Sequence, residues 1–260
     1  MVTLWFMVGA SAVAESDLNN SKAVARTIEN LNWITEEYPP FNYRDPKTAE
    51  VTGMAVEVLL KIFAKLGVSK TKVNFKIYPW ARGYHKVLND AGTALFLTTY
   101  TMDRLQKMKF VGPVVPNVIA VIAPKSNQLS IQFAKDLNRL KIGVVREDIG
   151  EQLLISQGVK PGSIDRLNSG LSMMKKMAAG RIDAVAYSHA TTQLLFKTAN
   201  INPNEYEIIY VLKNSTMGFA FHNSTDASVL EAIRKALYEL TVDGTLSDIQ
   251  VKYGLKSANE

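Results

Sequence analysis

An apolar run at residues 116–124, Pro-Asn-Val-Ile-Ala-Val-Ile-Ala-Pro, divides the sequence into two parts of similar pattern. Its β-branched residues between two prolines predict a strand that carries the chain from one part of the fold to another. Before this run, and again after it, short strand patterns alternate with amphipathic helix patterns. We therefore expect two structural units, with the pattern starting again near residue 118.

The part before the run contains the clearest helix pattern of the chain. Between Met54 and Leu66 apolar residues recur at three- and four-residue spacing, and Gly67 stands where a helix C-cap belongs. A loop built on Tyr38-Pro39-Pro40-Phe41 precedes this helix, and its prolines exclude regular strand pairing. The other patterns predict strands over 31–35, 73–77 and 94–98, and helices over 79–88 and after Thr101, which can cap its helix.

The part after the run repeats this alternation. A helix that ends near Gly158 begins at Asp148, which has capping-box spacing to Glu151. Strands and helices that alternate at these lengths form βαβ units, so the predicted fold class is α/β with mostly parallel sheets flanked by helices. The other patterns predict strands over 141–145, 164–167, 182–186, 208–212 and 217–221, and helices over 171–179, 190–199, 229–240 and 246–253.

The expected topology also predicts where a ligand would bind. In open α/β sheets, ligands lie outside the carboxyl ends of the strands. The loops after Thr35, Thr98, Val145 and Ala186 are therefore the predicted lining of a binding site. A cleft between two lobes is the expected place for it.

The composition excludes several classes of protein. Of the 260 residues 47% are apolar, which is enough for a core, and the net charge of +6 includes no basic block of the kind that grips nucleic acid. The chain has no cysteine, which removes disulfides, thiol nucleophiles and zinc–thiolate sites. His85, His189 and His222 lie far apart and lack metal-ligand spacing. We therefore predict no metal, no cofactor and no nucleic-acid partner.

The first fourteen residues are typical of an export signal. Residues 2–14 form a short apolar run that ends in Ala12-Val13-Ala14, as at a signal-peptidase site, although no lysine or arginine precedes it. A run of about 13 apolar residues is too short to span a hydrocarbon core of ~30 Å. Segment 1–14 is interpreted as a signal-peptide remnant, and the mature chain is expected to be soluble in the periplasm.

Five short motifs occur along the chain: Tyr38-Pro39-Pro40-Phe41 with Gly53, Pro79-Trp80-Ala81-Arg82, Thr101-Met102-Asp103-Arg104 with Phe110-Val111-Gly112-Pro113, Gly180-Arg181-Ile182-Asp183-Ala184-Val185, and Asp243-Gly244-Thr245-Leu246. In this order and at these distances they resemble the type II periplasmic solute-binding proteins, specifically family 3, the amino-acid-binding branch that serves ABC importers. The resemblance implies a discontinuous first lobe, residues 25–114 plus 215–260, and a second lobe, residues 118–212. It places two crossing strands at 113–117 and 213–217, about which the lobes close on a ligand.

The resemblance also implies a set of ligand-binding residues. Arg104 matches the arginine that pairs with the ligand's α-carboxylate, to which a guanidinium donates two parallel hydrogen bonds. Thr99 aligns with a small hydroxyl residue that helps to bind the same carboxylate, or it is a strand-end threonine that faces solvent. Tyr38 aligns with an aromatic that packs on the rest of the ligand, or it is a core tyrosine. Trp80 and Arg82 lie at a strand end that faces the cleft, where they are either ligand contacts or rim and core residues. Without the resemblance, Arg104 would be interpreted as a surface residue.

Two positions depart from the pattern of the relatives. Ser188 stands where they have the aspartate that takes the ligand's ammonium group. After the strand that ends at Val145, Glu147 and Asp148 replace a glycine and a threonine. Glu147 either supplies the missing negative charge or points to water and pairs with Arg146, whereas Asp148 is expected to cap its helix.

The predicted function is capture of a small polar solute, an amino acid or another carboxylate, for uptake by the membrane permease of an ABC importer. The protein is expected to be a monomer and to catalyse nothing. A sensor module that reports to a membrane receptor would bind its ligand in the same way. An enzyme on the same fold would need an acid or base in the cleft, for which Glu36, Glu37 and Glu147 are the candidates. The identity of the ligand, and whether it carries an ammonium group, stay open.

Overall fold

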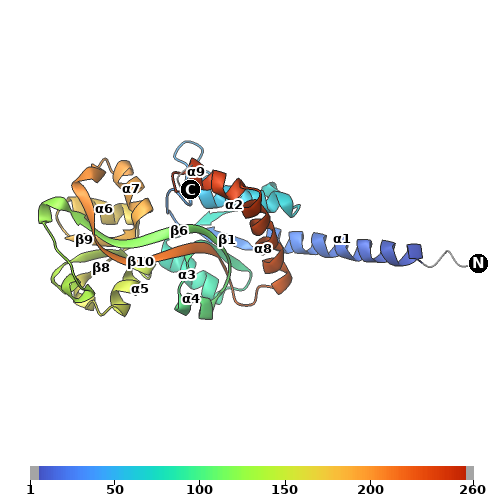
Figure 1. The fold of residues 1–260 in the computed structure, drawn as a ribbon, viewed down its shortest axis with the longest axis horizontal. Helices are drawn as coiled ribbons and strands as arrows, with labels where there is room; N and C mark the ends of the chain where they lie inside the picture. The colour runs from blue at the N-terminus through green and yellow to red at the C-terminus, as the bar shows by residue number, and fades with distance from the viewer. Residues whose placement is uncertain (1–5, 256–260) are drawn as a thin grey trace, which may run out of the picture.

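The computed structural model of the chain describes residues 6–255. Two groups of helices and strands lie side by side, and two long strands run through both (Figure 1). All strands but two short ones belong to one sheet in the order β4-β1-β5-β10-β6-β9-β7-β8. The two short strands, β2 (Tyr43–Arg44) and β3 (Val51–Thr52), form a separate antiparallel pair in the loop that precedes α2.

The first group is built on parallel strands β4 (Lys76–Ile77), β1 (Asn32–Thr35) and β5 (Thr93–Thr99), in which Asn32 pairs with Thr93 and Ile34 with Lys76. Helix α3 (Trp80–Asn89) packs against β1 and β5, and the short α4 (Met102–Lys107) follows β5. Helices α2 (Met54–Lys65), α8 (Ala227–Val242) and α9 (Thr245–Lys252) pack together on the other side of the strands (Figure 1).

The second group repeats this arrangement with parallel strands β9 (Ala184–Ser188), β7 (Ile142–Val145) and β8 (Ile164–Leu167). Helices α6 (Gly170–Ala178) and α7 (His189–Thr198) pack against each other on one side. Helix α5 (Ile149–Ser156) covers the other side, where it contacts β7 and β9. Each group is therefore a small α/β layer structure, as predicted.

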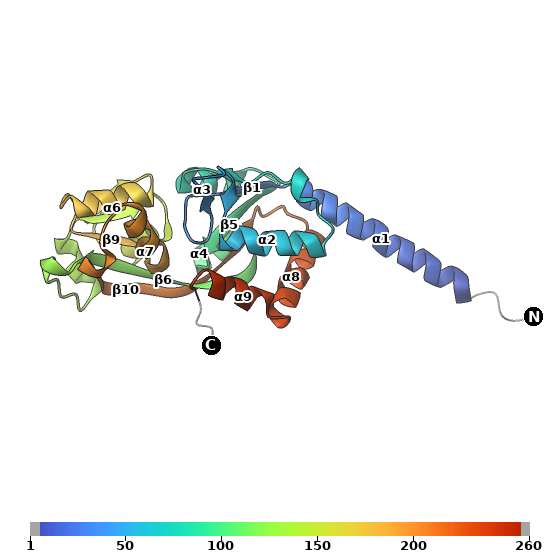
Figure 2. The same ribbon diagram turned by 90° about the horizontal axis from the view of Figure 1, so that it is seen from above.

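The long strands β6 (Lys109–Pro124) and β10 (Tyr206–Phe221) connect the two groups. They pair antiparallel along their whole length, from Lys109 opposite Phe221 to Pro124 opposite Tyr206. In the first group β10 is antiparallel to β5, and in the second β6 is antiparallel to β9. Figure 2 shows both strands passing along one side of the molecule between the groups.

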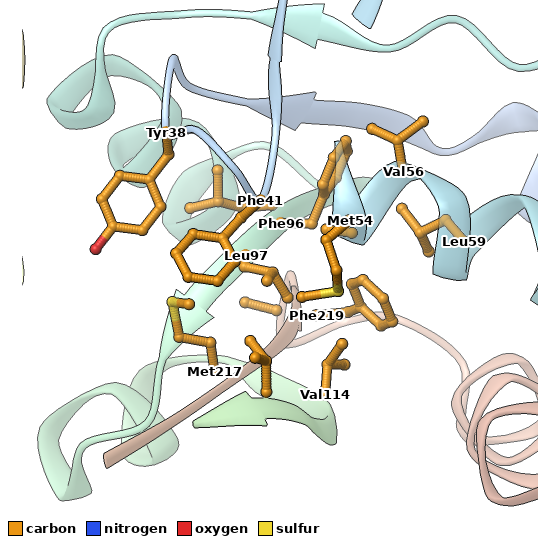
Figure 3. Close-up of a cluster of buried hydrophobic side chains, with 14 of the residues drawn as sticks. Tyr38, Phe41, Met54, Val56, Leu59, Phe96, Leu97, Val114, Met217 and Phe219 are labelled. Atoms are coloured by element: carbon orange, nitrogen blue, oxygen red, sulfur yellow. The ribbon is translucent and has the colours of Figure 1, made fainter. Parts of the chain in front are cut away.

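The core of the first group collects apolar side chains from distant parts of the chain. Phe41, Met54, Leu97, Val114 and Phe219 are buried in contact with one another, and Figure 3 shows them in the space between α2 and the long strands. The Tyr38 ring lies at the edge of this cluster with its hydroxyl directed away from it (Figure 3). The core therefore fixes the loop that follows β1. A second cluster, in the other group, joins side chains of β6, β7 and β9 to α5.

Most predicted elements are present, and the differences have physical reasons. The predicted strand over 73–77 is wrong in its first three residues, because β1 offers partners only to Lys76 and Ile77. The two strands predicted over 208–212 and 217–221 are one strand, since β6 provides a continuous partner. Gly67 ends α2 with a positive φ of 67°, as expected of a C-cap glycine. Short 3-10 helices lie at Lys70–Lys72, Lys125–Asn127, Ala134–Arg139, Pro161–Ser163 and Pro203–Glu205.

Helix α1 (Phe6–Asn30) was not predicted and projects from the body of the molecule (Figure 2). Its last turns reach the core, where Val24 and Ile28 are buried. Of the predicted signal-peptide remnant, residues 1–5 lie outside the described residues, and residues from 6 onward form the start of α1. Within residues 6–255 no helix combines the length and the hydropathy that a membrane span requires.

Candidate functional site

Arg104 lies at the centre of the candidate site and is completely buried. The hydroxyl of Thr101 accepts the backbone N–H of Arg104 at 3.1 Å and so caps α4, as predicted, which fixes the start of this short helix. The guanidinium Nη1 donates to the carbonyl of Thr99 at 3.2 Å, whereas Nε and Nη2 have no hydrogen-bond partner among residues 6–255. Its carbon atom Cζ lies 5.0 Å from the centre of the Trp80 ring and 5.3 Å from that of Tyr84, and the two rings stack with 5.6 Å between their centres, so the cation lies against a pair of stacked aromatic rings.

Four charged side chains are buried within the described residues, and only one of them is in an ion pair. Glu151 pairs with Arg166, but in the part of the chain that the structure describes Glu36, Arg104 and Asp148 have no oppositely charged partner within 4.0 Å. Because an isolated buried charge costs several kcal/mol, such groups are expected to have a function that requires them.

The two unpaired acids come from opposite groups of the fold. Glu36 follows β1 and Asp148 follows β7, and their exposed fractions are only 7% and 4%. Burial raises the pKa of Asp148 to about 6, while the Arg104 charge and the N–H of Ile149 act in the opposite direction. Burial also raises the pKa of Glu36 well above its usual range; the Asp148 charge adds to this and the Arg104 charge opposes it. Asp148 Oδ2 has no hydrogen-bond partner within the described range, 6–255.

A chain of polar side chains links the two groups beside the long strands. Asn117 of β6 donates from Nδ2 to the Thr99 hydroxyl at 3.5 Å and to Met217 Sδ at 3.3 Å. Its Oδ1 accepts the hydroxyl of Ser188 at 2.8 Å. Asn117 thus joins the end of β5 to the end of β9 and forms a polar floor for the site.

Two direct contacts close the space between the groups. The indole Nε1 of Trp80 donates to the backbone carbonyl of Glu147 at 2.9 Å. The rings of Tyr38 and Tyr187 meet edge to face, with 5.3 Å between their centres. Among the residues that the structure describes, the Tyr187 hydroxyl has no hydrogen-bond partner. A groove of about 230 Å³ lies beside these contacts. Both groups line it: residues Glu36, Glu37, Ile77, Tyr78, Pro79 and Trp80 from the first, and Asn168, Ser169 and Gly170 from the second.

The predicted site residues divide into two sets. Arg104, Thr99, Tyr38, Trp80 and Ser188 are all buried where the two groups meet. The side chain of Arg82 instead is exposed, with its guanidinium 4.6 Å from the centre of the Tyr78 ring.

The acidic loop after β7 decides between the two alternatives for Glu147 and corrects the expected cap at Asp148. The side chain of Glu147 is exposed, and only its backbone reaches Trp80, so the buried acid of this loop is Asp148. Asp148 occupies the N-cap position of α5 without the predicted side-chain capping bond. The reason is the left-handed backbone of Glu147, with φ of 61°, whose N–H instead donates to the Glu151 carboxylate at 2.6 Å.

Sequence reasoning missed several residues of this site. Asp148 was assigned to a helix cap, and Asn117, Tyr84 and Tyr187 were given no role. The signal that was available is position, because Glu36 and Asp148 each follow the carboxyl end of a parallel strand. Within residues 6–255 no cluster of three or more His, Cys, Asp or Glu side chains is suited to hold a metal ion.

Comparisons with known proteins agree with this architecture. The sequence model of the bacterial extracellular solute-binding proteins, family 3, matches residues 31–256. A probable amino-acid ABC transporter-binding protein of Haemophilus influenzae is 28% identical, over 93% of this chain and 92% of its own. The L-cystine-binding protein TcyA of Bacillus subtilis is 25% identical, in an alignment that covers 83% of this chain and 77% of TcyA. The fold is also similar to the solved structure of an ancestral arginine-binding protein bound to arginine, which has 27% sequence identity to this chain. The two superpose with a TM-score of 0.72, over 86% of this chain and 97% of the other.

Proposed function

The chain belongs to the bacterial extracellular solute-binding proteins of family 3, and we propose that it captures an amino acid between its two lobes for delivery to an ABC importer. This is the family that the five sequence motifs indicated. The relatives named above bind L-cystine or arginine, or are described as amino-acid transporter-binding proteins, which supports an amino acid as the ligand class.

The observation that carries the proposal is that the guanidinium of Arg104 is buried with part of its hydrogen-bonding capacity unused. A fully buried guanidinium has two nitrogen atoms, Nε and Nη2, without partners, and these two point in the parallel directions that suit the two oxygens of a carboxylate. Burying an ion without an opposite charge is unfavourable, so a carboxylate that reaches Arg104 removes a cost that the free protein bears. The ligand's α-carboxylate is the group proposed to do so, with the Thr99 hydroxyl beside it.

The aromatic side chains are proposed to enclose the rest of the ligand. Tyr38 and Tyr187 come from different groups of the fold and meet edge to face, while Trp80 reaches the loop that carries Glu147. Rigid rings of this kind bury apolar ligand surface and lose little conformational entropy on binding. Ser188 and Asn117 supply the polar floor.

Ligand entry requires the lobes to separate, and we propose the lobe boundaries predicted from the sequence: 25–114 plus 215–260, and 118–212. Among residues 6–255, only β6 and β10 pass between the two groups, which supports the hinge that we propose at 113–117 and 213–217. Two crossing strands permit rotation of each lobe as a rigid body, while the contacts of Trp80 and Tyr38 across the cleft hold the closed form.

The proposal extends to place and partners. The protein is proposed to work as a monomer in the periplasm, after export directed by its first residues, and to hand its ligand to a membrane permease. The relatives are binding proteins, and the same is proposed here, with no reaction on the ligand. Incubation with the bound amino acid followed by mass spectrometry tests this point, because any conversion of the ligand would contradict it.

The experiment that tests the proposed function is a thermal-shift screen of the twenty amino acids and L-cystine, followed by calorimetry on each that raises Tm. A ligand at 1,000 times its Kd should stabilise the protein by about 4 kcal/mol. Arg104→Ala should weaken binding by roughly 2–5 kcal/mol because the carboxylate pair is desolvated. The matched control is Arg82→Ala, which removes an exposed arginine and should leave Kd within about twofold. Absence of any amino-acid ligand would refute the proposal.

A further inference from the structure

The loop between β7 and α5 contains a turn that its own sequence disfavours. The backbone N–H of Asp148 donates to the carbonyl of Val145 at 3.1 Å and closes the turn formed by residues 145–148. Glu147 lies within this turn with φ of 61°, a left-handed conformation that glycine adopts freely and that a residue with a Cβ atom disfavours. The turn therefore needs a further interaction to hold it.

That interaction comes from Glu151, in the first turn of α5. One oxygen of its carboxylate accepts the backbone N–H of Glu147 at 2.6 Å, and the other accepts Nε–H of Arg166 on β8. The Glu151 side chain is buried, so water and salt screen this ion pair less than one on the surface. Glu151 thus ties the turn at Glu147 to the neighbouring strand β8.

The turn directs the carbonyl of Glu147 toward the other lobe. This carbonyl accepts the indole N–H of Trp80 at 2.9 Å and, from its own lobe, Nε2–H of Gln152 at 2.9 Å. A carbonyl oxygen has two lone pairs, so each of the two donors has one. When the lobes separate, the bond to Trp80 breaks and the bond to Gln152 keeps the carbonyl satisfied. The contact between the lobes can therefore release without leaving the Glu147 carbonyl unpaired.

We propose that Glu151 is a positioning residue for closure of the lobes: its carboxylate holds the left-handed turn at Glu147, and the turn presents the Glu147 carbonyl to Trp80. This inference rests on the proposed function and deepens it, because it names a part of the second lobe on which closure around the ligand depends. Glu151 acts through the backbone of Glu147 and needs no contact with the ligand.

The proposal requires Glu151 and Trp80 to act on the same contact. Loss of either one removes one hydrogen bond between the lobes, which corresponds to about a fivefold change in Kd. Glu151→Met keeps the length of the side chain and removes both acceptor oxygens. If Glu151 served only to stabilise the second lobe, its replacement would lower Tm and leave the effect of Trp80→Phe on Kd unchanged.

Glycine at position 147 supplies a second readout that a purely structural role of Glu151 would not produce. Because glycine adopts a positive φ without steric cost, Glu147→Gly should form the turn without help from Glu151. Adding Glu147→Gly to Glu151→Met should therefore restore Kd to within about twofold of the wild type. Glu147→Val should do the opposite, because a β-branched residue disfavours this conformation, and should weaken binding about fivefold although side chain 147 is exposed.

The test is calorimetry at pH 7.5 on the full chain, with the amino acid that raises the wild-type Tm most among the twenty amino acids and L-cystine as the probe. Trp80→Phe and Glu151→Met should each weaken binding about fivefold. The double variant should also lose about fivefold, and not the roughly 25-fold that two independent sites would give. The matched control is Asp165→Asn, which removes the ion pair of Asp165 with Lys176 in the same lobe and should keep the wild-type Kd.

The outcomes separate this inference from the proposed function. If an amino acid binds the wild type and Glu151→Met keeps its affinity, the positioning role is overturned while the proposed function stands. Two losses that multiply to about 25-fold, or a Kd that Glu147→Gly does not restore, overturn it in the same way. If no amino acid binds the wild-type protein, both are overturned. Should Glu151→Met fail to fold, Glu147→Val decides: an unchanged Kd overturns the positioning role, and a fivefold loss supports it.

Discussion

Replacing Arg104 with methionine should separate ligand binding from the stability of the free protein. Methionine has a similar length and no charge, so it keeps contact with the rings of Trp80 and Tyr84 while removing the buried cation. Arg104→Met is therefore expected to abolish the ligand-induced rise in Tm without lowering the Tm of the free protein.

The magnitudes follow from the surroundings of Arg104. Replacing a buried ionic group by an apolar one of similar size is often stabilising by about 1–4 kcal/mol. The loss of two cation–π contacts offsets roughly 1–2 kcal/mol of this. The free protein should therefore be unchanged or up to about 2 kcal/mol more stable. For binding, a loss of about 4 kcal/mol weakens Kd roughly 1,000-fold. A ligand present at 1,000 times the wild-type Kd then stabilises the variant by only about 0.4 kcal/mol, instead of about 4.

The assay is a pair of thermal unfolding curves for each protein, with and without the amino acid that binds the wild type. For a chain of this size 1 kcal/mol corresponds to about 2–4 °C, so the wild-type shift should be about 8–16 °C and that of Arg104→Met about 1 °C. The reasoning is refuted if Arg104→Met lowers the Tm of the free protein by several degrees and keeps the ligand shift. Arg104 would then be a structural residue and not part of the site.

Four further changes test other parts of the account. Burial raises the pKa of Asp148 to about 6, above its value of about 3.9 in an unfolded chain. The free protein should therefore lose stability as pH rises from about 4 to beyond 6. Urea unfolding at several pH values measures this slope, which Asp148→Asn should flatten. Gly150→Ala places a Cβ atom 2.2 Å from the Ala186 carbonyl oxygen and should cost at least about 2 kcal/mol of unfolding free energy, and unchanged stability would contradict the close approach of α5 to β9. Trp80→Phe removes the hydrogen bond to the Glu147 carbonyl and should weaken ligand binding by about 1 kcal/mol in calorimetry; an unaltered Kd would show that this contact does not hold the closed form. Glu147→Gln should leave Kd within about twofold because the side chain is exposed, and a loss confined to ligands with an ammonium group would return the cation-binding role to Glu147.

The fold was largely predictable because its elements have strong local signals. The apolar spacing of α2 and its C-cap at Gly67 identified that helix, and the apolar run after Pro116 identified the strand that leaves the first group. The length of β10 was not predictable in the same way, since Lys213 to Thr216 have no strand pattern of their own. They are extended because Val115 to Ile119 of β6 pair with the segment that contains them. Tertiary pairing here overrides local propensity.

The candidate site was predictable only where a motif or a strand end marked a residue. Arg104, Thr99 and Tyr38 were proposed as ligand contacts in this way, and each is buried where the two groups meet. The choice between Glu147 and Asp148 could not be made from the sequence, because it depends on one left-handed residue that turns the loop. With φ of 61°, Glu147 directs its own side chain to solvent and leaves that of Asp148 inside.

The most direct test of the central claim is a crystal structure of the protein with the amino acid that gives the largest thermal shift. The account predicts electron density for the ligand between the two lobes, with its carboxylate oxygens within hydrogen-bond distance of Arg104 Nε and Nη2. Density for the ligand at any other place, or a ligand between the lobes that makes no contact with the Arg104 guanidinium, would contradict it.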